Sequence, residues 1–569
     1  MHVSTAEYNN SCVSQRNNTN RKAKRWLTVG AWVFGLAVLL FVGLFFFTNW
    51  MQGKLERMVQ EQSDGVYRLN LHGLEVSPFI GSVSVDSLSL QPDYERWQQL
   101  QQQGAKTAGT LLDLRAHAIQ LQGVNLLGTL FGSNVDVEQL RLQDPKLLMT
   151  LMRKDTTEER KPLHETVKGF MQQLHIGKIA VDNANLRYRE SPQTEGFLFS
   201  LKKFNLTVDD IKLDSQAYYA PDRAYYAKQM VLEASKAMYF LPGGKYRFMV
   251  DTLLVDANKQ ELLAKQLVLD PLFPLSEVGT AKGKPTSSHK FKAKLLRVEG
   301  IDVNAHALHN SYIAQRVLLE EPRLEVFEVQ QKTLEKSKKP LPHDLAQRVK
   351  EAFLLDTVAI RSGYIRYAEK VPEAQTPGHI TFASLNATFS NLTNMPEQTS
   401  IQNPTVLEAS TRVMGKAQLH VTFRLPLLHK NGYHTLRGSF GETNPEMLNA
   451  ILVPTSFVRV ESGYISSGEF SAELTNDSAN GKMTVIYSNL DVEMLTKGAG
   501  GKQGLGKEVI SEVADWVAIK DSNPMNGEAP RVGNITVTRN PHSSMFSYWK
   551  DCLASGFLSS MGLKSKARK

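Results

Sequence analysis

Two stretches of the 569-residue chain decide its fold: LHIGKIAVDNANLRYRE at residues 174–190 and FLLDTVAIRSGYIRYAE at residues 353–369. They align without a gap, and both end in Arg-Tyr-x-Glu. Apolar and polar residues alternate over most of each stretch, which is the period of a strand with one apolar and one wet face. The fold class is therefore predicted to be mainly β, with a few helices.

The similarity extends along the chain at an offset of 177 to 181 residues. Further pairs of similar segments begin at Val66 and Lys245, Ser87 and Gln266, Ala118 and Leu295, Leu140 and Val317, and Lys203 and Ser384. Because several matches occur in order at one offset, we predict a duplicated β unit spanning 66–244 and 245–424. Asn-Ala, Ser-Gly and Gln-Gly pairs between the alternating segments are typical of turns.

Each unit is predicted to contain one helix, at about 162–174 after Pro162 and about 341–353 after Pro340. Apolar residues recur there at helical spacing, and proline favours the first helical turn. Downstream, the pattern predicts a C-terminal β unit at 425–495, a Gly-rich linker at 496–507, and a terminal helix–strand–helix segment with a basic tail at 508–569.

The apolar residues of the alternating strands are the candidate functional surface. Amphipathic strands need something against their apolar face. Either two closed sandwiches bury each other's faces, or one elongated sheet leaves an open groove, and alternation alone fits both. The candidate groove-lining residues are Ile119, Leu121, Val135, Val137, Leu140, Leu142, Ile179, Val181, Leu296, Val298, Val358 and Ile360.

Residues 26–50 form an uncharged apolar run with tryptophan at both ends, long enough to cross a hydrocarbon core of about 30 Å. Near its end, at 45–47, the run has three phenylalanines where a signal peptide would have small residues for cleavage. An uncleaved anchor is therefore favoured over a signal peptide. Residues 1–25 carry a net charge of +4. This charge predicts a cytoplasmic basic tail, a single transmembrane helix, and export of everything that follows.

Most of the formal net charge of +9 lies at the two ends of the chain, since residues 545–569 also carry +4. The terminal helix places four apolar residues on one stripe and ends in a basic tail, so it is a candidate for docking on a partner or an anionic membrane. The alternative is a helix that covers the last strands. The candidate docking residues are Phe546, Trp549, Leu553, Phe557, Lys564, Lys566, Arg568 and Lys569.

No motif in the sequence predicts catalysis, a metal or a cofactor. The two cysteines, Cys12 and Cys552, lie at opposite ends and cannot form a disulfide framework. Gly501-x4-Gly506-Lys507 resembles part of a phosphate-binding loop, but Glu508 stands where the magnesium-binding Ser or Thr belongs. Basic residues do not interleave with aromatics as in single-strand binders, so nucleic acid is not expected as a partner.

Several segments together resemble the AsmA-like superfamily of Gram-negative envelope proteins, in one of its uncharacterised branches. These segments are GLEVSPFIGSVSVDSLSLQPD at 73–93, IGKIAVDNANLRYRE, TVAIRSGYIRYAE, VRVESGYISSGEFSAEL at 458–474, and NP…RVGNITVTRNP…FSYWKDCLASG at 523–556. The resemblance implies a single-pass inner-membrane protein whose β-rich bulk lies in the periplasm. It also implies an elongated apolar groove and a part in phospholipid transfer or outer-membrane biogenesis, without catalytic residues.

Two functions follow as expectations. In the first, the chain handles phospholipid, whose acyl chains lie along the alternating apolar residues. In the second, it is a non-enzymatic scaffold or assembly factor that binds other envelope proteins. A solvent-open apolar groove would favour the first, and closed, dry cores would favour the second. No cofactor is expected in either.

Overall fold

The computed structural model describes residues 52–77, 81–105, 107–124, 134–153, 162–167, 173–194, 196–279, 287–330, 338–372, 374–495 and 520–563. Within these ranges the protein is mainly β, which confirms the predicted class. The predicted anchor at 26–50, the linker at 496–507, the helical stretch at 508–519 and the basic residues Lys564, Lys566, Arg568 and Lys569 lie outside the described residues.

The chain divides into two compact units. Unit 1 comprises the described residues up to Ser235, with Val255–Asn258 and Val303–Ser311. Unit 2 comprises Lys236–Leu254, Lys259–Asp302 and the described residues from Tyr312 onward. This division places the predicted C-terminal β unit, 425–495, in the same compact body as most of 245–424.

Within the described residues, unit 1 contains six complete strands and five helices. The strands are β1 (Tyr67–Ser77), β2 (Ser82–Pro92), β3 (Thr110–Gln122), β4 (Asn134–Leu151), β5 (Gln173–Arg189) and β6 (Phe199–Leu213). The helices are α2 (Gln52–Gln62), α3 (Tyr94–Gln102), α5 (Leu163–Val167), α6 (Ser215–Tyr219) and α7 (Val303–His309). Strand β7 (Ala227–Phe240) is divided between the two units.

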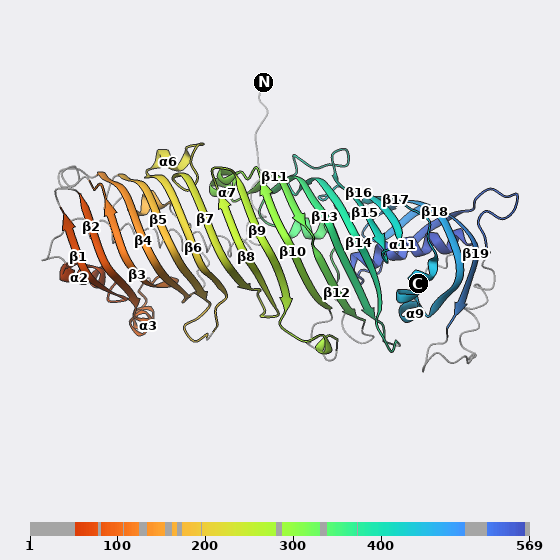
Figure 1. Ribbon diagram of the computed structural model, residues 1–569, viewed down its shortest axis with the longest axis horizontal. Coiled ribbons are helices and arrows are strands. Elements are labelled where there is room, and N and C mark those ends of the chain that lie inside the picture. Colours follow the sequence, from red (N-terminus) through yellow and green to blue (C-terminus); the bar gives the residue numbers. More distant parts are fainter. Residues whose placement is uncertain are drawn as a thin grey trace, which may run out of the picture. The chain divides into compact units, whose positions relative to one another are not determined.

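Strands β1 to β6 pair with one another in chain order (Figure 1). All pairs are antiparallel except β4–β5, which is parallel. A parallel pair requires the chain to return to the starting end of the sheet, and α5 lies in this crossover. Of the predicted helix at 162–174, α5 accounts for Leu163–Val167, residues 168–172 lie outside the described residues, and β5 begins at Gln173.

Unit 2 contains the remaining strands and helices that the structure describes. Its strands are β8 (Tyr246–Asp256, which ends in the Val255–Asn258 segment of unit 1), β9 (Glu261–Pro271), β10 (Ser287–Glu299), β11 (Tyr312–Glu320), β12 (Arg323–Val329), β13 (Phe353–Lys370), β14 (Gly378–Thr393), β15 (Thr405–Val413), β16 (Ala417–Leu425), β17 (His434–Phe440), β18 (Val458–Leu474), β19 (Ser478–Met494) and β20 (Val532–Thr538). Its helices are η1 (Leu275–Glu277), α8 (Pro342–Arg348), η2 (Pro445–Leu448), α9 (Asn449–Ser456) and α11 (Met545–Ser560).

The pairing order of unit 1 recurs in unit 2. Strand β9 is antiparallel to β10, and β10 is antiparallel to both β11 and β12. Strands β11 and β12 are both parallel to β13, and α8 lies in the crossover before it. From β13 to β20 each strand is antiparallel to the next. The predicted helix at 341–353 is shorter than expected, because α8 ends at Arg348 and β13 starts at Phe353.

Left-handed backbone at non-glycine residues also recurs at the offset of 177 to 181 residues. The matching pairs, all with φ between 49° and 59°, are Asp144 and Glu321, Asn183 and Ser362, Lys203 and Ser384, and Asp210 and Asn391. In β5 the register shifts on both sides of Ala184, and in β13 it shifts on both sides of Gly363. These common irregularities support the predicted duplication.

The irregularities within β5 and β13 are β-bulges, in which one extra residue resets the alternation of the strand. The predicted turn pairs Asn183-Ala184 and Ser362-Gly363 therefore lie inside continuous strands rather than between strands, which corrects their assignment as turns. The extra residue returns apolar side chains to the same face on both sides of the bulge.

Side chains from helices bond the free edges of the terminal strands. In unit 1 the Glu56 carboxylate of α2 accepts a hydrogen bond from the Leu71 N–H of β1, at 3.2 Å. In unit 2 the Asn534 N–H donates to Ser559 Oγ at 2.9 Å and the Thr536 N–H to Ser555 Oγ at 3.1 Å. Asn534 and Thr536 are two residues apart on β20, and their partners Ser559 and Ser555 are four residues apart on α11.

Candidate functional site

In unit 1 the apolar side chains form rows that cross the strands from β1 to β6. One row contains Val83, Leu121, Leu140, Ile179 and Val208. The next contains Leu74, Val85, Ile119, Leu142, Val181 and Leu206. Val135 and Val137 begin two shorter rows through β5 and β6. The structure therefore brings all eight predicted residues of this repeat onto one face.

Unit 2 contains two equivalent rows, which the other four predicted residues share. One contains Ala264, Leu296, Leu319, Ile360, Ala387, Ala409 and Val421. The other contains Leu262, Val298, Val317, Val358, Phe389, Leu407 and Phe423. Because directly opposed side chains on paired strands lie about 5 Å apart, such a row presents a nearly continuous apolar line.

The predicted residues divide into two groups by burial. Six residues of unit 1 are buried, from 0% exposed at Val137 to 7% at Ile179, and the others are Ile119, Leu121, Val135 and Leu140. Leu142 and Val181 of unit 1 and all four residues of unit 2, Leu296, Val298, Val358 and Ile360, are half-buried. The rows of unit 2 are thus more accessible than those of unit 1.

An apolar row of this kind can bind alkyl chains but cannot perform acid–base chemistry. Its side chains carry no ionisable group, and burial of each CH₂ group contributes about 0.8 kcal/mol. Neighbouring strands are about 4.8 Å apart, so an extended chain lying across several strands can contact one side chain after another. The binding energy would come from many small, non-directional contacts.

The terminal helix α11 packs on the last strands of unit 2. The Trp549 and Phe423 rings lie 4.5 Å apart, and Phe546 packs against Tyr367 and Phe382 at 5.0 and 5.7 Å. Leu553 and Phe557 pack against the same core. The four apolar docking candidates therefore contact the chain itself, which favours the alternative that this helix covers the final strands.

The contact of α11 with β17 includes a neutral imidazole. Burial lowers the pKa of His434 to about 4, although a hydrogen bond to the Gly432 carbonyl opposes the change. With Nδ1–H directed at that carbonyl at 2.8 Å, Nε2 is left to accept a hydrogen bond from Trp549 Nε1 at 3.3 Å. Both ring nitrogens of the neutral imidazole are thus engaged in hydrogen bonds that help to hold α11 against β17.

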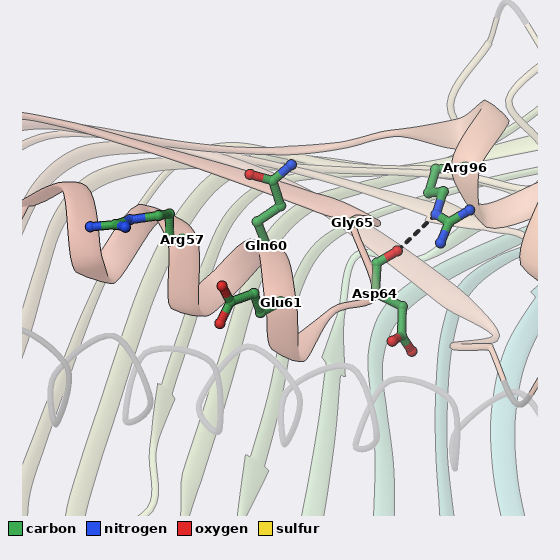
Figure 2. A pocket seen from close by; sticks show the side chains of 6 residues that line it. All are labelled: Arg57, Gln60, Glu61, Asp64, Gly65 and Arg96. Carbon is green, nitrogen blue, oxygen red and sulfur yellow. Dashed lines mark hydrogen bonds between the residues drawn. The ribbon is translucent and has the colours of Figure 1, made fainter.

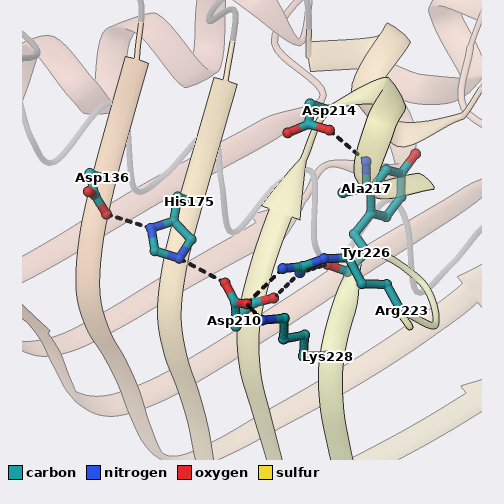
Figure 3. Close-up of polar contacts among 8 residues, drawn as sticks. All are labelled: Asp136, His175, Asp210, Asp214, Ala217, Arg223, Tyr226 and Lys228. Carbon is teal, nitrogen blue, oxygen red and sulfur yellow. Dashed lines mark hydrogen bonds and ion pairs between the residues drawn. The ribbon is translucent and has the colours of Figure 1, made fainter. Parts of the chain in front are cut away.

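A polar network lies at one edge of the unit 1 sheet, near the N-terminal ends of β4 and β5 and the C-terminal end of β6 (Figure 3). His175 contacts Asp136 through Nδ1 at 2.9 Å and Asp210 through Nε2 at 3.0 Å. Arg223 donates to the Asp210 carboxylate at 2.7 Å and to the Tyr226 carbonyl at 3.1 Å. Lys228 lies 3.3 Å from Asp210. The network holds the segment after α6 against the sheet, and we assign it a structural role.

The network keeps Asp210 ionised. Burial alone would raise the pKa of this carboxyl group, but hydrogen bonds from Arg223 and Lys228 outweigh the burial and hold the pKa at about 2. Both ring nitrogens of His175 already have carboxylate partners.

A shallow pocket lies between α2 and α3 of unit 1 (Figure 2). It is lined by Arg57, Gln60, Glu61, Asp64, Gly65 and Arg96. Arg96 Nε donates to the Asp64 carbonyl at 2.8 Å. Two arginines and two carboxylates balance each other, so the pocket offers neither net charge for an ion nor an apolar wall for an alkyl chain.

Metal and thiol chemistry find no support in the part of the chain that the structure describes. No group of three or more His, Cys, Asp or Glu residues there is arranged to hold a metal ion. Cys552 is fully buried, and this burial raises the pKa of its thiol to about 12, the opposite of an activated nucleophile. Among the same residues, no helix is both long and apolar enough to cross a membrane.

Comparison with known proteins adds no assignment. No protein-family model matches the chain, and no curated protein matches it either.

Proposed function

We propose that this chain is an AsmA-like protein of the bacterial inner membrane that handles phospholipid with the apolar face of its sheet. Residues 26–50 anchor it, with the N-terminus in the cytoplasm and the bulk in the periplasm. It takes part in phospholipid transfer or outer-membrane biogenesis. It acts without catalysis and without a cofactor, since the function consists of binding and release.

The observation that carries this proposal is the continuity of the apolar rows. Bulges at Asn183 and Ser362 keep the side chains of β5 and β13 on one face along the whole strand. The rows then continue through antiparallel and parallel pairs alike. Unit 1 shows the same continuity on a buried face, so it is the half-buried state of the continuous rows in unit 2 that favours an acyl-chain track.

The lipid would lie on unit 2 rather than on unit 1. Leu296, Val298, Val358 and Ile360 are half-buried, so part of each side chain remains exposed for contact with an alkyl chain. The core cluster beneath β8 to β10 contains only four buried apolar residues among those described, namely Val250, Ala264, Leu267 and Ala293. Headgroups would remain in water at the margin of the sheet.

The second candidate function is a scaffold that binds envelope proteins. It is favoured by the closed apolar clusters of unit 1 and of the C-terminal part of unit 2, where side chains such as Leu71 and Leu474 are fully buried. If the apolar rows of unit 2 were closed in the same way, no apolar surface would remain for lipid to bind.

Mass spectrometry of lipid retained by the purified full-length chain tests the first function. We expect phospholipid to copurify with the wild type, and Val317→Asp to lower the retained amount because it places a charge in an apolar row. The matched control is Arg316→Asp on the exposed opposite side of β11, which should retain lipid as the wild type does. Recovery of no lipid from the wild type would refute the proposal and leave the scaffold function as the remaining candidate.

A further inference from the structure

We propose that the loop 272–275 of unit 2, between β9 and β10, is a bilayer contact through which phospholipid reaches the half-buried rows. The loop reads Leu-Phe-Pro-Leu. This inference rests on the proposed lipid-handling function for its purpose. The contact itself follows from the exposure, rigidity and charge of the loop.

Two leucines of this loop are exposed to solvent, Leu272 by 45% and Leu275 by 57%. Single exposed apolar residues are ordinary on protein surfaces, but two large ones within four uncharged residues form a patch that needs an explanation. Insertion into an interface would remove both leucines from water, whereas a loop that faced only water would gain nothing from them.

The backbone and two aromatic rings hold the loop in place. The Leu272 N–H donates to the Lys245 carbonyl at 2.8 Å, and the Val278 N–H donates to the Leu275 carbonyl at 3.1 Å. Phe273 packs edge-on against Tyr246, with ring centroids 5.6 Å apart. The Tyr246 hydroxyl in turn accepts from the His289 N–H at 3.2 Å. The leucines are therefore presented by an anchored loop.

The loop is continuous with the proposed lipid-binding rows. A left-handed residue, Gln266, keeps Leu267 and Leu269 of β9 in phase with the earlier residues Leu262 and Ala264. Leu269 is paired with Phe291 of β10, near the end of β9 from which the loop departs. An acyl chain that left a bilayer at this loop would meet apolar side chains all the way to Leu296.

Charge favours a bilayer surface as the occupant of this patch. Lys245 and Lys290, both exposed, lie in the two segments that hold the base of the loop. Asp270 lies 4.0 Å from Arg247, which offsets its charge. Glu277 follows Leu275 by two residues, so Lys245, Arg247 and Lys290 exceed Asp270 and Glu277 by one positive charge. An apolar tip with a net positive surround fits a membrane that contains anionic phospholipid.

Depth-dependent quenching tests the contact directly. The full-length chain with Cys12→Ser and Leu275→Cys, labelled with an environment-sensitive fluorophore, is reconstituted into vesicles of phosphatidylethanolamine and brominated phosphatidylglycerol. Ile401→Cys in the β14–β15 loop, where the native side chain is 52% exposed, is the matched control. We expect quenching at residue 275 to exceed that at residue 401 at least threefold, and equal quenching would overturn the inference.

Transfer of a fluorescent phospholipid to acceptor vesicles tests the purpose of the contact. The double variant Leu272→Asp, Leu275→Asp should slow transfer about tenfold, the loss expected when about 1.4 kcal/mol of interfacial binding is removed. Ile401→Asp should change it less than twofold. Lipid retained by the variant should equal that of the wild type, because the rows are intact.

The two proposals fail in different ways. If the wild type retains no lipid, the proposed function is refuted, and the quenching measurement still decides whether the loop enters a bilayer. If lipid is retained and transfer falls in the double variant without quenching at residue 275, the loop affects transfer without entering the bilayer, and the bilayer inference is overturned.

Discussion

The sheet β1–β6 of unit 1 and the sheet β9–β14 of unit 2 share a pairing order and bulge positions, but helices cover their apolar faces differently. In the second sheet, Ala346 of α8 and Phe546 of α11 pack at β13 and β14. In unit 1 the side chains Val59 of α2, Leu163 of α5 and Ala217 of α6 join the core cluster. The cluster beneath β8 to β10 has no such helical contribution among the residues that the structure describes. Bulges therefore determine which face is apolar, whereas the elements at the margins determine whether that face is open.

The largest expected effect is on the free energy of unfolding, for substitutions at matched core positions of the two repeats. Ile176→Ala in unit 1 should lower the free energy of unfolding by about 3 kcal/mol, since the side chain is 1% exposed. Leu355→Ala, at the equivalent position of the second repeat, should cost about 1 kcal/mol because Leu355 is half-buried. Urea denaturation of the full chain measures both, and equal losses would show that the second face is closed as well.

The next comparison concerns the closed end of unit 2. A side chain at Gly533 would collide with the backbone of Ser560 and Gly556, so Gly533→Val should displace α11 and cost about 2 kcal/mol. Hydrogen exchange over 545–560 should become faster. Gly441→Val, where the nearest atom would lie 3.9 Å away, is the control and should leave that exchange unchanged.

Acid should weaken unit 1 through a group that the second repeat lacks, since Asn391 stands where the first repeat has Asp210. The pKa of Asp210 is held at about 2, so its contribution is complete above the ordinary pKa of a carboxyl group and is lost as the pH falls to about 2. Asp210→Asn should therefore lower the thermal midpoint at pH 7 and match the wild type near pH 2. The ion pair of Asp182 with Arg141 is exposed, so Asp182→Asn should lower the thermal midpoint at pH 7 much less.

The smallest effect concerns the bulges themselves. Ser362 has φ 53°, a conformation that glycine adopts without strain, so Ser362→Gly should raise the free energy of unfolding by about 0.5 kcal/mol. Asn183 has φ 55°, but its side chain donates to the Asp144 carboxylate. Asn183→Gly should consequently bring no gain, and a gain at both positions would mean that this hydrogen bond is immaterial.

Alternation along the chain was sufficient to predict the strands and the apolar face. The stretch 458–474 is β18 at the same bounds, and all twelve predicted groove residues lie in the rows. Periodicity could not reveal the closure of that face, because closure depends on helices such as α2 and α6 that are short and polar in sequence. The difference between buried Ile119 and half-buried Leu296 is therefore a tertiary effect.

Helical spacing was less reliable near the crossovers. Leu174 continues the spacing of the predicted first helix, yet it pairs with Val135 and Leu213 in the sheet. Leu341 is fully buried, whereas Leu345 and Val349 of the same predicted stripe are 49% and 42% exposed. Short apolar segments fit both periods, and tertiary pairing decided between them.

The serines of α11 have a consequence for self-association. A strand at the end of a sheet offers free N–H groups to any further strand, and a repeated sheet could in this way polymerise head to tail into filaments. Ser555 and Ser559 already accept the hydrogen bonds of Thr536 and Asn534. Helix α11 thus blocks the addition of a further strand at β20, so the sheet ends at this strand whatever the concentration of the protein.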